Sequence, residues 1–464
     1  MKRYRLGIIK FIGMLIVLAL YFFMAYAMLW DIGALHILDE WMRRKALVVI
    51  SIMYCVVMLA LLVWLEALAV GRRRILDLIF GFFFSSLCVN ILAAILVRIF
   101  AGPAIPLLIG MVIVYVLVQS VIGLVWILVC HKFYEHYQFR KEALFVYGSR
   151  EDEGEYVRVN NTINRYFTIS RSMHYAQGEE KICAEIEDRE ENVVVYIGDI
   201  PAEVRNRILK FCMKQGIDCY SIPKISDIYV QNAQVMQLND KLLLRYPPLG
   251  IEGGARLAKR LMDVVLSLIL IGCTSPIMLV VSILIRAEDG GPVLYRQERV
   301  TKDGAAFQMI KFRSMCIGAE EDGARLAAQN DARVTKIGRR IRNLHFDELP
   351  QLVNVLRGEM SLVGPRPERR EFIEEYSERI PEFGERLKVK GGLTGYAQIY
   401  GRYNTEPEDK IKYDLYYIYN YSLWLDFKLI ILTIRILSQK ENTQGITEGQ
   451  RSALRERPAE NRHE

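Results

Sequence analysis

The chain has 464 residues, enough for about two to four domains, and 52% of them are hydrophobic although 24% are charged. This mixture indicates membrane segments joined to water-soluble domains and argues against one uniform globule. The formal net charge of +7 fits an anionic lipid surface, a phosphorylated substrate or nucleic acid, although basic membrane loops explain it equally well. Eight scattered cysteines without a Cys-x-x-Cys pair argue against a zinc site or a disulfide framework.

Four apolar runs open the chain, and each is long enough to cross a bilayer as a helix, which takes about 20 residues. We expect these spans at about Leu6–Trp30, Ala46–Ala69, Ile75–Ile99 and Ile105–Cys130. Basic clusters before the first span, between the second and third, and after the fourth all lie on one side, which should be the cytoplasm. Arg43–Lys45 would lie on the other side and do not fit. A transporter would need polar residues inside the spans, and the runs look nearly devoid of them.

Residues 141–245 show short apolar strands alternating with a helix, which predicts a small α/β domain with a parallel sheet. We expect strands at Ala143–Tyr147, Asn192–Ile197 and Cys219–Ile222, and a helix from about Pro201 to Lys214. Gly148 stands where a dinucleotide-binding loop would begin, but three carboxylates follow within residues 149–153 and would repel a pyrophosphate. We therefore expect a degenerate Rossmann-like domain with a structural or assembly role, which invites dimerisation.

A fifth apolar run, Val264–Ile285, is also long enough to span. Crossing would carry everything after it out of the cytoplasm, and Ser275 and Pro276 interrupt the run near its centre. Proline breaks or kinks a helix, so we expect a re-entrant helix at about residues 257–286 that enters and leaves on one side. Lys259, Arg260 and Asp263 at its start would lie at the membrane interface. The alternative is a kinked spanning helix.

Polar motifs concentrate between residues 290 and 401. They are Lys311–Met315, the basic stretch Lys336–Arg342, Asp347–Gln351, Met360–Pro367 and Gly391–Gly395. Adjacent carboxylates can hold a divalent cation such as Mg²⁺ and offer a nucleophile, and guanidinium groups can neutralise a diphosphate. A solvated helix start explains most Asp-Glu pairs, and a turn explains most Pro-Arg-Pro sequences, so each motif alone is weak.

Together and in order, the motifs are specific. Lys259-Arg260-x-x-Asp263, Ser275-Pro276, Lys311–Met315, Asp347–Gln351, Val363–Pro367 and Gly392–Gly395 resemble those of the monotopic polyprenyl-phosphate phosphoglycosyl transferases, the bacterial sugar transferase family. The resemblance covers about Leu257–Leu437. Four leading spans plus an α/β domain are similar to the large subclass, which initiates exopolysaccharide, capsule or O-antigen synthesis.

The resemblance implies a ping-pong transfer of sugar-1-phosphate from a UDP-sugar to undecaprenyl phosphate at the cytoplasmic face of the bacterial plasma membrane. It implies that Asp347 forms a covalent phosphosugar ester and binds Mg²⁺, and that Glu348 supports it. Substrate phosphates would contact six residues: Lys311, Arg313, Arg342, Arg366, Pro365 and Pro367. Ser275 and Pro276 would break the re-entrant helix. The identity of the sugar stays open, and nucleic acid is not an expected partner.

The expected architecture is a membrane protein, α with α/β. It comprises four transmembrane helices (1–135), the degenerate α/β domain (141–245), a monotopic catalytic domain (255–438) and a disordered tail (440–464). Leu425–Leu437 is too short and too charged to span, which favours an interfacial amphipathic helix over a buried core helix. A membrane scaffold with vestigial motifs is the competing reading, and the intact Asp347-Glu348 pair counts against it.

Overall fold

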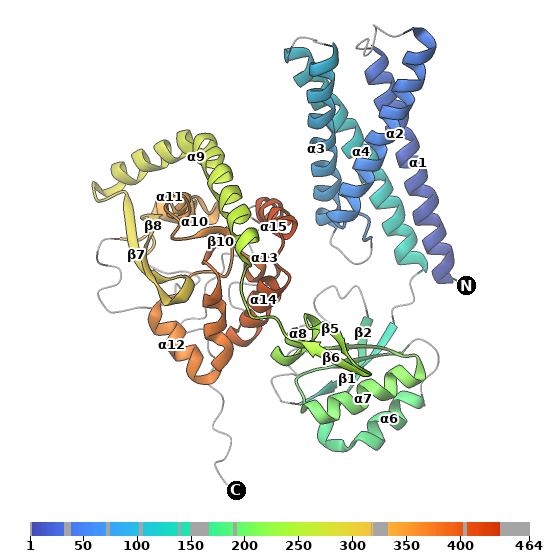
Figure 1. Cartoon of the computed structure of the whole chain (residues 1–464), viewed down its shortest axis with the longest axis vertical. Helices are drawn as coiled ribbons and strands as arrows, with labels where there is room; N and C mark the ends of the chain where they lie inside the picture. Colours follow the sequence, from blue (N-terminus) through green and yellow to red (C-terminus); the bar gives the residue numbers. More distant parts are fainter. Residues whose placement is uncertain are drawn as a thin grey trace. The chain divides into compact units, whose positions relative to one another are not determined.

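A computed structural model describes residues 2–31, 39–70, 75–101, 105–137, 141–148, 167–188, 193–316, 318, 333–401 and 406–436 (Figure 1). The chain divides into two compact units, Met1–Ile222 and Pro223–Glu464. The predicted tail at 440–464, the basic cluster at 72–74 and the acidic stretch at 149–153 lie outside the described residues.

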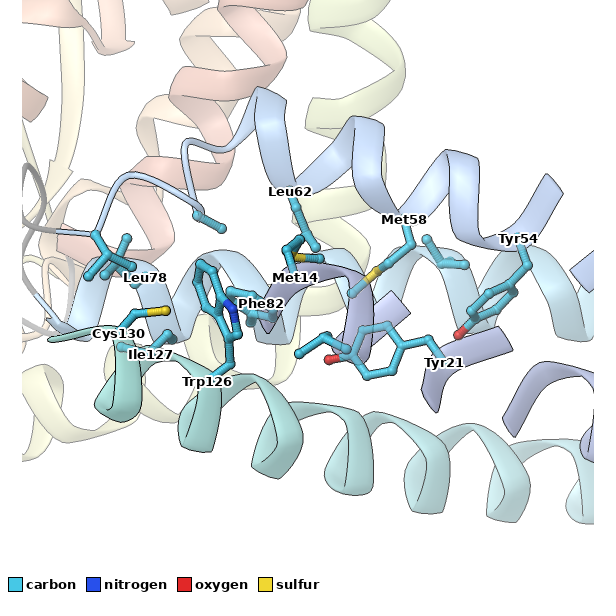
Figure 2. Close-up of a cluster of buried hydrophobic side chains, with 14 of the residues drawn as sticks. Met14, Tyr21, Tyr54, Met58, Leu62, Leu78, Phe82, Trp126, Ile127 and Cys130 are labelled. Atoms are coloured by element: carbon cyan, nitrogen blue, oxygen red, sulfur yellow. The ribbon is translucent and has the colours of Figure 1, made fainter. Parts of the chain in front are cut away.

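The first unit begins with four long helices. They are α1 (Lys2–Asp31), α2 (Glu40–Trp64), α3 (Ile75–Ala101) and α4 (Ile105–Tyr137). Each is long and apolar enough to cross a membrane by length and composition, and a fifth such helix lies in the second unit. Figure 2 shows side chains of all four helices meeting in one apolar cluster, with Tyr21, Met58, Phe82 and Trp126 at its centre. The chain is therefore a membrane protein whose leading helices form a packed bundle.

Helix α2 begins earlier than its hydropathy suggested, at Glu40 instead of near Ala46. The basic residues Arg43–Lys45 thus lie within its first turns and not in a loop. Arg44 pairs with Glu40 one turn earlier, and the Arg43 guanidinium lies 4.3 Å from the centre of the Trp30 ring. An acidic residue in the first turn favours a helix start because it complements the helix dipole. Hydropathy alone could not place this charged first turn.

The bundle buries a polar network, which corrects our expectation that these helices nearly lack polar groups. The amide of Gln119 donates to the Tyr54 hydroxyl at 2.7 Å, and this hydroxyl donates to Oδ1 of Asn90 at 3.1 Å. Nδ2 of Asn90 donates to Oε1 of Gln119 at 2.8 Å, which closes a ring across α2, α3 and α4. Tyr21 of α1 donates to the Gln119 carbonyl at 2.7 Å. Single polar residues barely lower the average hydropathy of a long apolar run, so the pattern concealed them.

The remainder of the first unit is a four-stranded parallel sheet in the order β2-β1-β3-β4. Its elements are β1 (Lys141–Tyr147), β2 (Phe167–His174), the 3₁₀ helix η1 (Tyr175–Gln177), α6 (Glu179–Glu187), β3 (Val193–Ile197), α7 (Ala202–Gln215) and β4 (Asp218–Ser221). The expected parallel α/β arrangement is confirmed. Our sequence reading overlooked β2 because polar residues interrupt its apolar pattern.

Gly148, at the carboxyl end of β1, meets the protein's own backbone. A Cβ atom there would lie 2.3 Å from the carbonyl oxygen of Asp199, so only glycine fits. The Gly148 carbonyl lies 3.0 Å from Nε2 of His174, in hydrogen-bonding distance. This end of β1 is therefore engaged by neighbouring strands, which supports a structural role for the domain.

The second unit contains mostly short elements. In chain order they are α8 (Ile225–Gln231), β5 (Gln234–Leu238), β6 (Lys241–Arg245), α9 (Gly253–Asp289), β7 (Leu294–Val300), η2 (Lys302–Gly304), β8 (Ala306–Phe312), α10 (Lys336–Asn343), η3 (Phe346–Glu348), α11 (Gln351–Arg357), β9 (Ser361–Val363), α12 (Arg370–Arg379), η4 (Pro381–Lys388), β10 (Gly392–Thr394), α13 (Tyr396–Tyr400), α14 (Pro407–Tyr419) and α15 (Leu423–Ile436). Strands pair as antiparallel β5-β6 and β7-β8 and as parallel β9-β10.

Helix α15 contributes to the core of this unit. Asp426, Leu429 and Leu432 are buried, whereas Trp424 is 70% exposed and Ile434 is 54% exposed. The buried face is what the less favoured alternative, a core helix, predicted. Contact between the exposed apolar face of α15 and a membrane surface stays a prediction.

Helix α9 bends in its middle, as its ribbon in Figure 1 shows. Pro276 lies inside the helix and cannot donate to the carbonyl four residues earlier, that of Gly272. The Ser275 hydroxyl donates to this same carbonyl at 3.0 Å. Serine thus satisfies the acceptor that proline leaves without its helical donor.

Candidate active site

Asp347 and Glu348 lie in η3, between α10 and α11. The preceding helix starts with Thr335, whose hydroxyl accepts a hydrogen bond from the Gly338 amide at 2.9 Å. The chain then turns at His345, whose φ of 55° is left-handed. A non-glycine residue in this conformation costs about 1–3 kcal/mol, and such residues cluster at functional sites. The turn places both carboxylates in a half-buried position ahead of α11.

Glu348 is the anion at the centre of this site. Nη2 of Arg366 donates to Oε1 of Glu348 at 2.6 Å, and Nζ of Lys311 lies 3.6 Å from the same oxygen. Burial by itself would raise the pKa of Glu348, but the charges of Arg366 and Lys311 hold it far below its usual range. Glu348 is therefore an ionised carboxylate fixed between two cations.

Asp347 differs from its neighbour. Burial raises the pKa of Asp347 to about 6, and the charge of Glu348 adds to this rise, although Lys311, Arg342 and Arg366 oppose it. The pKa values of these two adjacent carboxylates therefore differ widely, because Glu348 is paired with cations and Asp347 is desolvated. A desolvated carboxylate near neutral pKa suits a nucleophile.

The structure separates two basic residues that the sequence placed together. Lys311 and Arg313 are two positions apart and would share one face of a continuous strand. Because β8 ends at Phe312, the Arg313 side chain instead bonds the end of α9, where its Nη1 donates to Oδ2 of Asp289 at 2.7 Å. Lys311 keeps its place beside Glu348, and burial lowers its pKa. The predicted phosphate contact of Arg313 gains no support from this geometry.

Asn354, which our sequence reading missed, ties the strand of Lys311 to the helix that follows the carboxylates. It is fully buried in α11. Its Oδ1 accepts from the Ile310 amide at 3.0 Å, and its Nδ2 donates to the Gln308 carbonyl at 2.8 Å. A polar residue inside an apolar helix was the available signal. These bonds fix β8, and hence Lys311, relative to Glu348.

Arg366 is partly exposed, whereas the two prolines that flank it, Pro365 and Pro367, are buried. The loop that carries it leaves β9 and runs against the glycine-rich segment around β10. The Gly392 amide donates to the Pro365 carbonyl at 2.8 Å, and the Gly364 amide donates to the Thr394 carbonyl at 2.9 Å. The prolines and these backbone bonds hold the loop while the guanidinium extends to Glu348.

The glycine motif at 391–395 has a steric cause. A Cβ atom on Gly392 or Gly395 would lie 2.1 Å from backbone atoms of Gly364, and one on Gly391 would lie 2.5 Å from the ring of Pro367. Any side chain at these positions would displace the loop that presents Arg366. The motif is therefore a backing for the Pro-Arg-Pro loop.

The Lys259-Arg260-x-x-Asp263 motif at the start of α9 binds the rest of the second unit. Nζ of Lys259 lies 2.5 Å from Oδ2 of Asp426, and Asp263 accepts from the Ser361 hydroxyl at 2.7 Å. Arg260 donates to two carbonyls at the end of α11. Lys259 and Asp263 are buried, so these side chains lock α9 to β9 and α15 and do not extend outward. Whether this end of α9 lies at headgroup depth stays a prediction.

A magnesium ion needs few protein ligands, since it binds one or two carboxylates and completes its shell with phosphate oxygens and water. Among the described residues, no group of three or more His, Cys, Asp and Glu side chains could hold a metal by itself. Glu348 is engaged by Arg366 and Lys311, which leaves Asp347 as the carboxylate that could bind the ion. The site therefore fits Mg²⁺ bound jointly with a phosphate substrate.

Comparison with known proteins gives a consistent family. The sequence profile of the bacterial sugar transferase family matches residues 254–440. The UDP-N-acetylgalactosamine-undecaprenyl-phosphate N-acetylgalactosaminephosphotransferase of Aeromonas hydrophila is 41% identical over 234 residues, which is 50% of this chain and 55% of that protein. The UDP-glucose:undecaprenyl-phosphate glucose-1-phosphate transferase of Caulobacter vibrioides is 42% identical over 191 residues, which is 40% of this chain and 72% of that protein.

An uncharacterized sugar transferase of Bacillus subtilis, EpsL, is 41% identical over 186 residues and is matched over 90% of its own length. The chain spans about half the length of the first curated relatives that it matches, at 55% and 47%. The ordered motifs, the paired carboxylates beside Arg366 and these similarities agree. The chain belongs to the bacterial sugar transferase family.

Proposed function

We propose that this protein transfers sugar-1-phosphate from a UDP-sugar to undecaprenyl phosphate and releases UMP, as the first membrane step of an exopolysaccharide, capsule or O-antigen pathway. The observation that carries the proposal is the pair of unequal carboxylates, with Glu348 bound by Arg366 and Lys311 and with Asp347 desolvated beside it. The relatives are named for UDP-glucose and UDP-N-acetylgalactosamine, which supports a UDP-hexose as donor.

In the first half-reaction, a carboxylate oxygen of Asp347 attacks the β-phosphorus of the UDP-sugar. A bond forms between this oxygen and phosphorus, the bond from phosphorus to the bridging oxygen breaks, and UMP leaves with that oxygen. In the second half-reaction, an oxygen of undecaprenyl phosphate attacks the same phosphorus and displaces Asp347. The products are undecaprenyl-diphosphate-sugar and the restored carboxylate.

The surrounding charges have distinct roles in this scheme. Arg366 and Lys311 neutralise the donor diphosphate and the charge that develops on UMP, because both cations already converge on one point beside Asp347. Glu348 holds these cations in place and orients the acceptor phosphate. Asp347 would hold Mg²⁺, which supplies further neutralisation of the diphosphate when bound.

We also propose that α9 is re-entrant. Its start is bound to the rest of the second unit, here called the catalytic unit, through Lys259 and Asp263, and its end is bound to the same unit through Asp289 and Arg313. Its middle exposes large apolar side chains: Leu268, Ile269, Leu279, Val280, Ile283 and Leu284. A helix that is bound at both ends to one unit can dip into a single leaflet and return on the same side. The contacts at both ends of α9 support this arrangement. The catalytic unit would then lie on the cytoplasmic face, where UDP-sugars are made.

The experiment is a nucleotide-release assay in lipid nanodiscs with Mg²⁺, undecaprenyl phosphate and a panel of UDP-hexoses. We expect UMP from one donor with the wild-type protein and none with Asp347→Asn, because the amide is not a nucleophile. Asp303→Asn, which changes a carboxylate that is 71% exposed, is the matched control and should retain activity. Release of UDP would mean ordinary glycosyl transfer, and silence across the panel would favour a scaffold with vestigial motifs. Measuring the mass of the same nanodisc sample tests the predicted homodimer.

A further inference from the structure

Next to the Pro-Arg-Pro loop lies a set of charged side chains, two of them buried and three largely buried, none of which our sequence reading identified. They are Arg299 on β7, Glu368 after the loop, Arg386 on η4, and Lys410 and Asp414 on α14. Arg386 is 2% exposed and Asp414 is 1% exposed, so both are inside the protein. Such charges are retained in an interior only where partners compensate them.

Arg386 contacts the loop itself. Its Nη2 donates to the backbone carbonyl of Arg366 at 2.9 Å, and the same nitrogen lies 2.8 Å from Oδ2 of Asp414. Its Nη1 lies 3.9 Å from Glu368, and its guanidinium lies 4.8 Å from the centre of the Phe383 ring. One buried guanidinium therefore connects α14 to the backbone of the residue that reaches Glu348.

The next carbonyl along the loop is held in the same way. Nη1 of Arg299 donates to the Pro367 carbonyl at 3.3 Å and lies 3.4 Å from Glu368. Glu368 also pairs with Lys410 at 2.5 Å. Burial by itself would raise the pKa of Glu368, but these three cations lower it to about 2, so it stays ionised at neutral pH. Two successive carbonyls, those of Arg366 and Pro367, thus accept hydrogen bonds from two arginines. Both arginines also lie beside the same carboxylate, that of Glu368.

We propose that Arg386 is a positioning residue: it holds the Arg366 backbone so that the Arg366 guanidinium is directed at Glu348 and at the donor diphosphate. This inference rests on the proposed function. Arg386 bonds the backbone of Arg366 and not its guanidinium, so it would act on the substrate only through Arg366. A lysine at 386 keeps the charge but replaces the planar guanidinium, whose Nη2 contacts Asp414 and the Arg366 carbonyl while its Nη1 extends toward Glu368, with one ammonium nitrogen on a flexible stem.

The test is a double-mutant cycle that measures UMP release. The wild-type protein first identifies the donor, and the variants are then compared with that donor. Arg386→Lys alone should lower kcat by about tenfold to a hundredfold, because a misplaced cation loses much of its effect on the transition state. In an Arg366→Gln background, Arg386→Lys should cost little more, because the guanidinium that it positions is gone. Arg379→Lys, at an exposed arginine of α12, is the matched control and should change neither background.

The KM for the UDP-sugar is the second readout. Because a displaced Arg366 guanidinium binds the donor diphosphate less well, Arg386→Lys should raise this KM. General destabilisation would lower the amount of active enzyme, and hence the apparent kcat, without changing KM. Equal losses in both backgrounds, or an unchanged KM, would overturn the proposal. If Arg386→Lys does not fold, Asp414→Asn keeps the arginine, removes its anchor and should show the same coupling to Arg366→Gln with a smaller loss.

If the wild-type protein released no UMP, the proposed function would fail, and the cycle would not be reached. If the wild type is active and the cycle is additive, only the positioning role fails. The two failures are therefore distinguishable.

Discussion

The helix bundle and the catalytic unit both bury polar side chains, but they use different chemistry. In the bundle, Tyr54, Asn90 and Gln119 satisfy one another with neutral hydrogen bonds. In the catalytic unit, Glu368 and its cationic partners are charged. The neutral network joins three helices, and the charged network joins β7, η4 and α14 to one loop.

The difference follows from the surroundings of each network. Helices in hydrocarbon have no water to stabilise a charge, so a neutral ring of donors and acceptors is the less costly way to bind them together. The catalytic unit must instead present cations to a diphosphate. Largely buried carboxylates such as Glu368 allow it to concentrate arginines near the site without leaving them uncompensated.

The largest expected effect is on the charged network. Glu368→Gln leaves Arg299, Arg386 and Lys410 beside a neutral amide, and we expect a loss of about 3 kcal/mol of stability, because breaking a buried pair strands its partners. Unfolding of the nanodisc-embedded protein measures it. Glu371→Gln, on the exposed side of α12, should stay within about 0.5 kcal/mol of wild type. Equal unfolding of the two variants would mean that the network contributes no stability.

The next effect concerns pH. Because the pKa of Asp347 is raised to about 6, its reactive carboxylate form is lost as the pH falls through 6 and is fully present above it. The rate of UMP release in a single turnover should therefore fall about tenfold per pH unit below this point. A limb near 4 would show that Asp347 keeps an ordinary carboxyl pKa. A variant of the bundle network should not move the acid limb of the pH profile, since that network is neutral and contains no carboxylate.

The smallest effect is expected in the bundle. Gln119→Leu removes one member of the neutral ring and should destabilise the protein by about 1 kcal/mol, since hydrogen bonds between helices in membranes are individually modest. Val118→Leu, at a neighbouring position that is 42% exposed, is the control and should be close to neutral. A loss from Gln119→Leu as large as that from Glu368→Gln would break the contrast between the two networks.

The sequence by itself determined the features whose cause is local. The apolar runs predicted the long helices, because a helix that meets lipid must be apolar along its whole length. Ser275-Pro276 predicted the bend in α9, because proline removes one backbone donor from any helix, whatever the helix packs against. Asp347, Glu348 and Arg366 were predicted as site residues because the motifs that carry them, taken in order, resemble those of the family.

Only the tertiary structure decided which distant groups meet. Arg313 bonds Asp289 because β8 ends one residue too early for it to share the face of Lys311. The Gln119 amide finds Tyr54 on another helix, and Arg386 finds the Arg366 carbonyl on another loop. A charge or amide in a sequence shows that a partner is required, but the choice of partner depends on how elements far apart in the chain pack together.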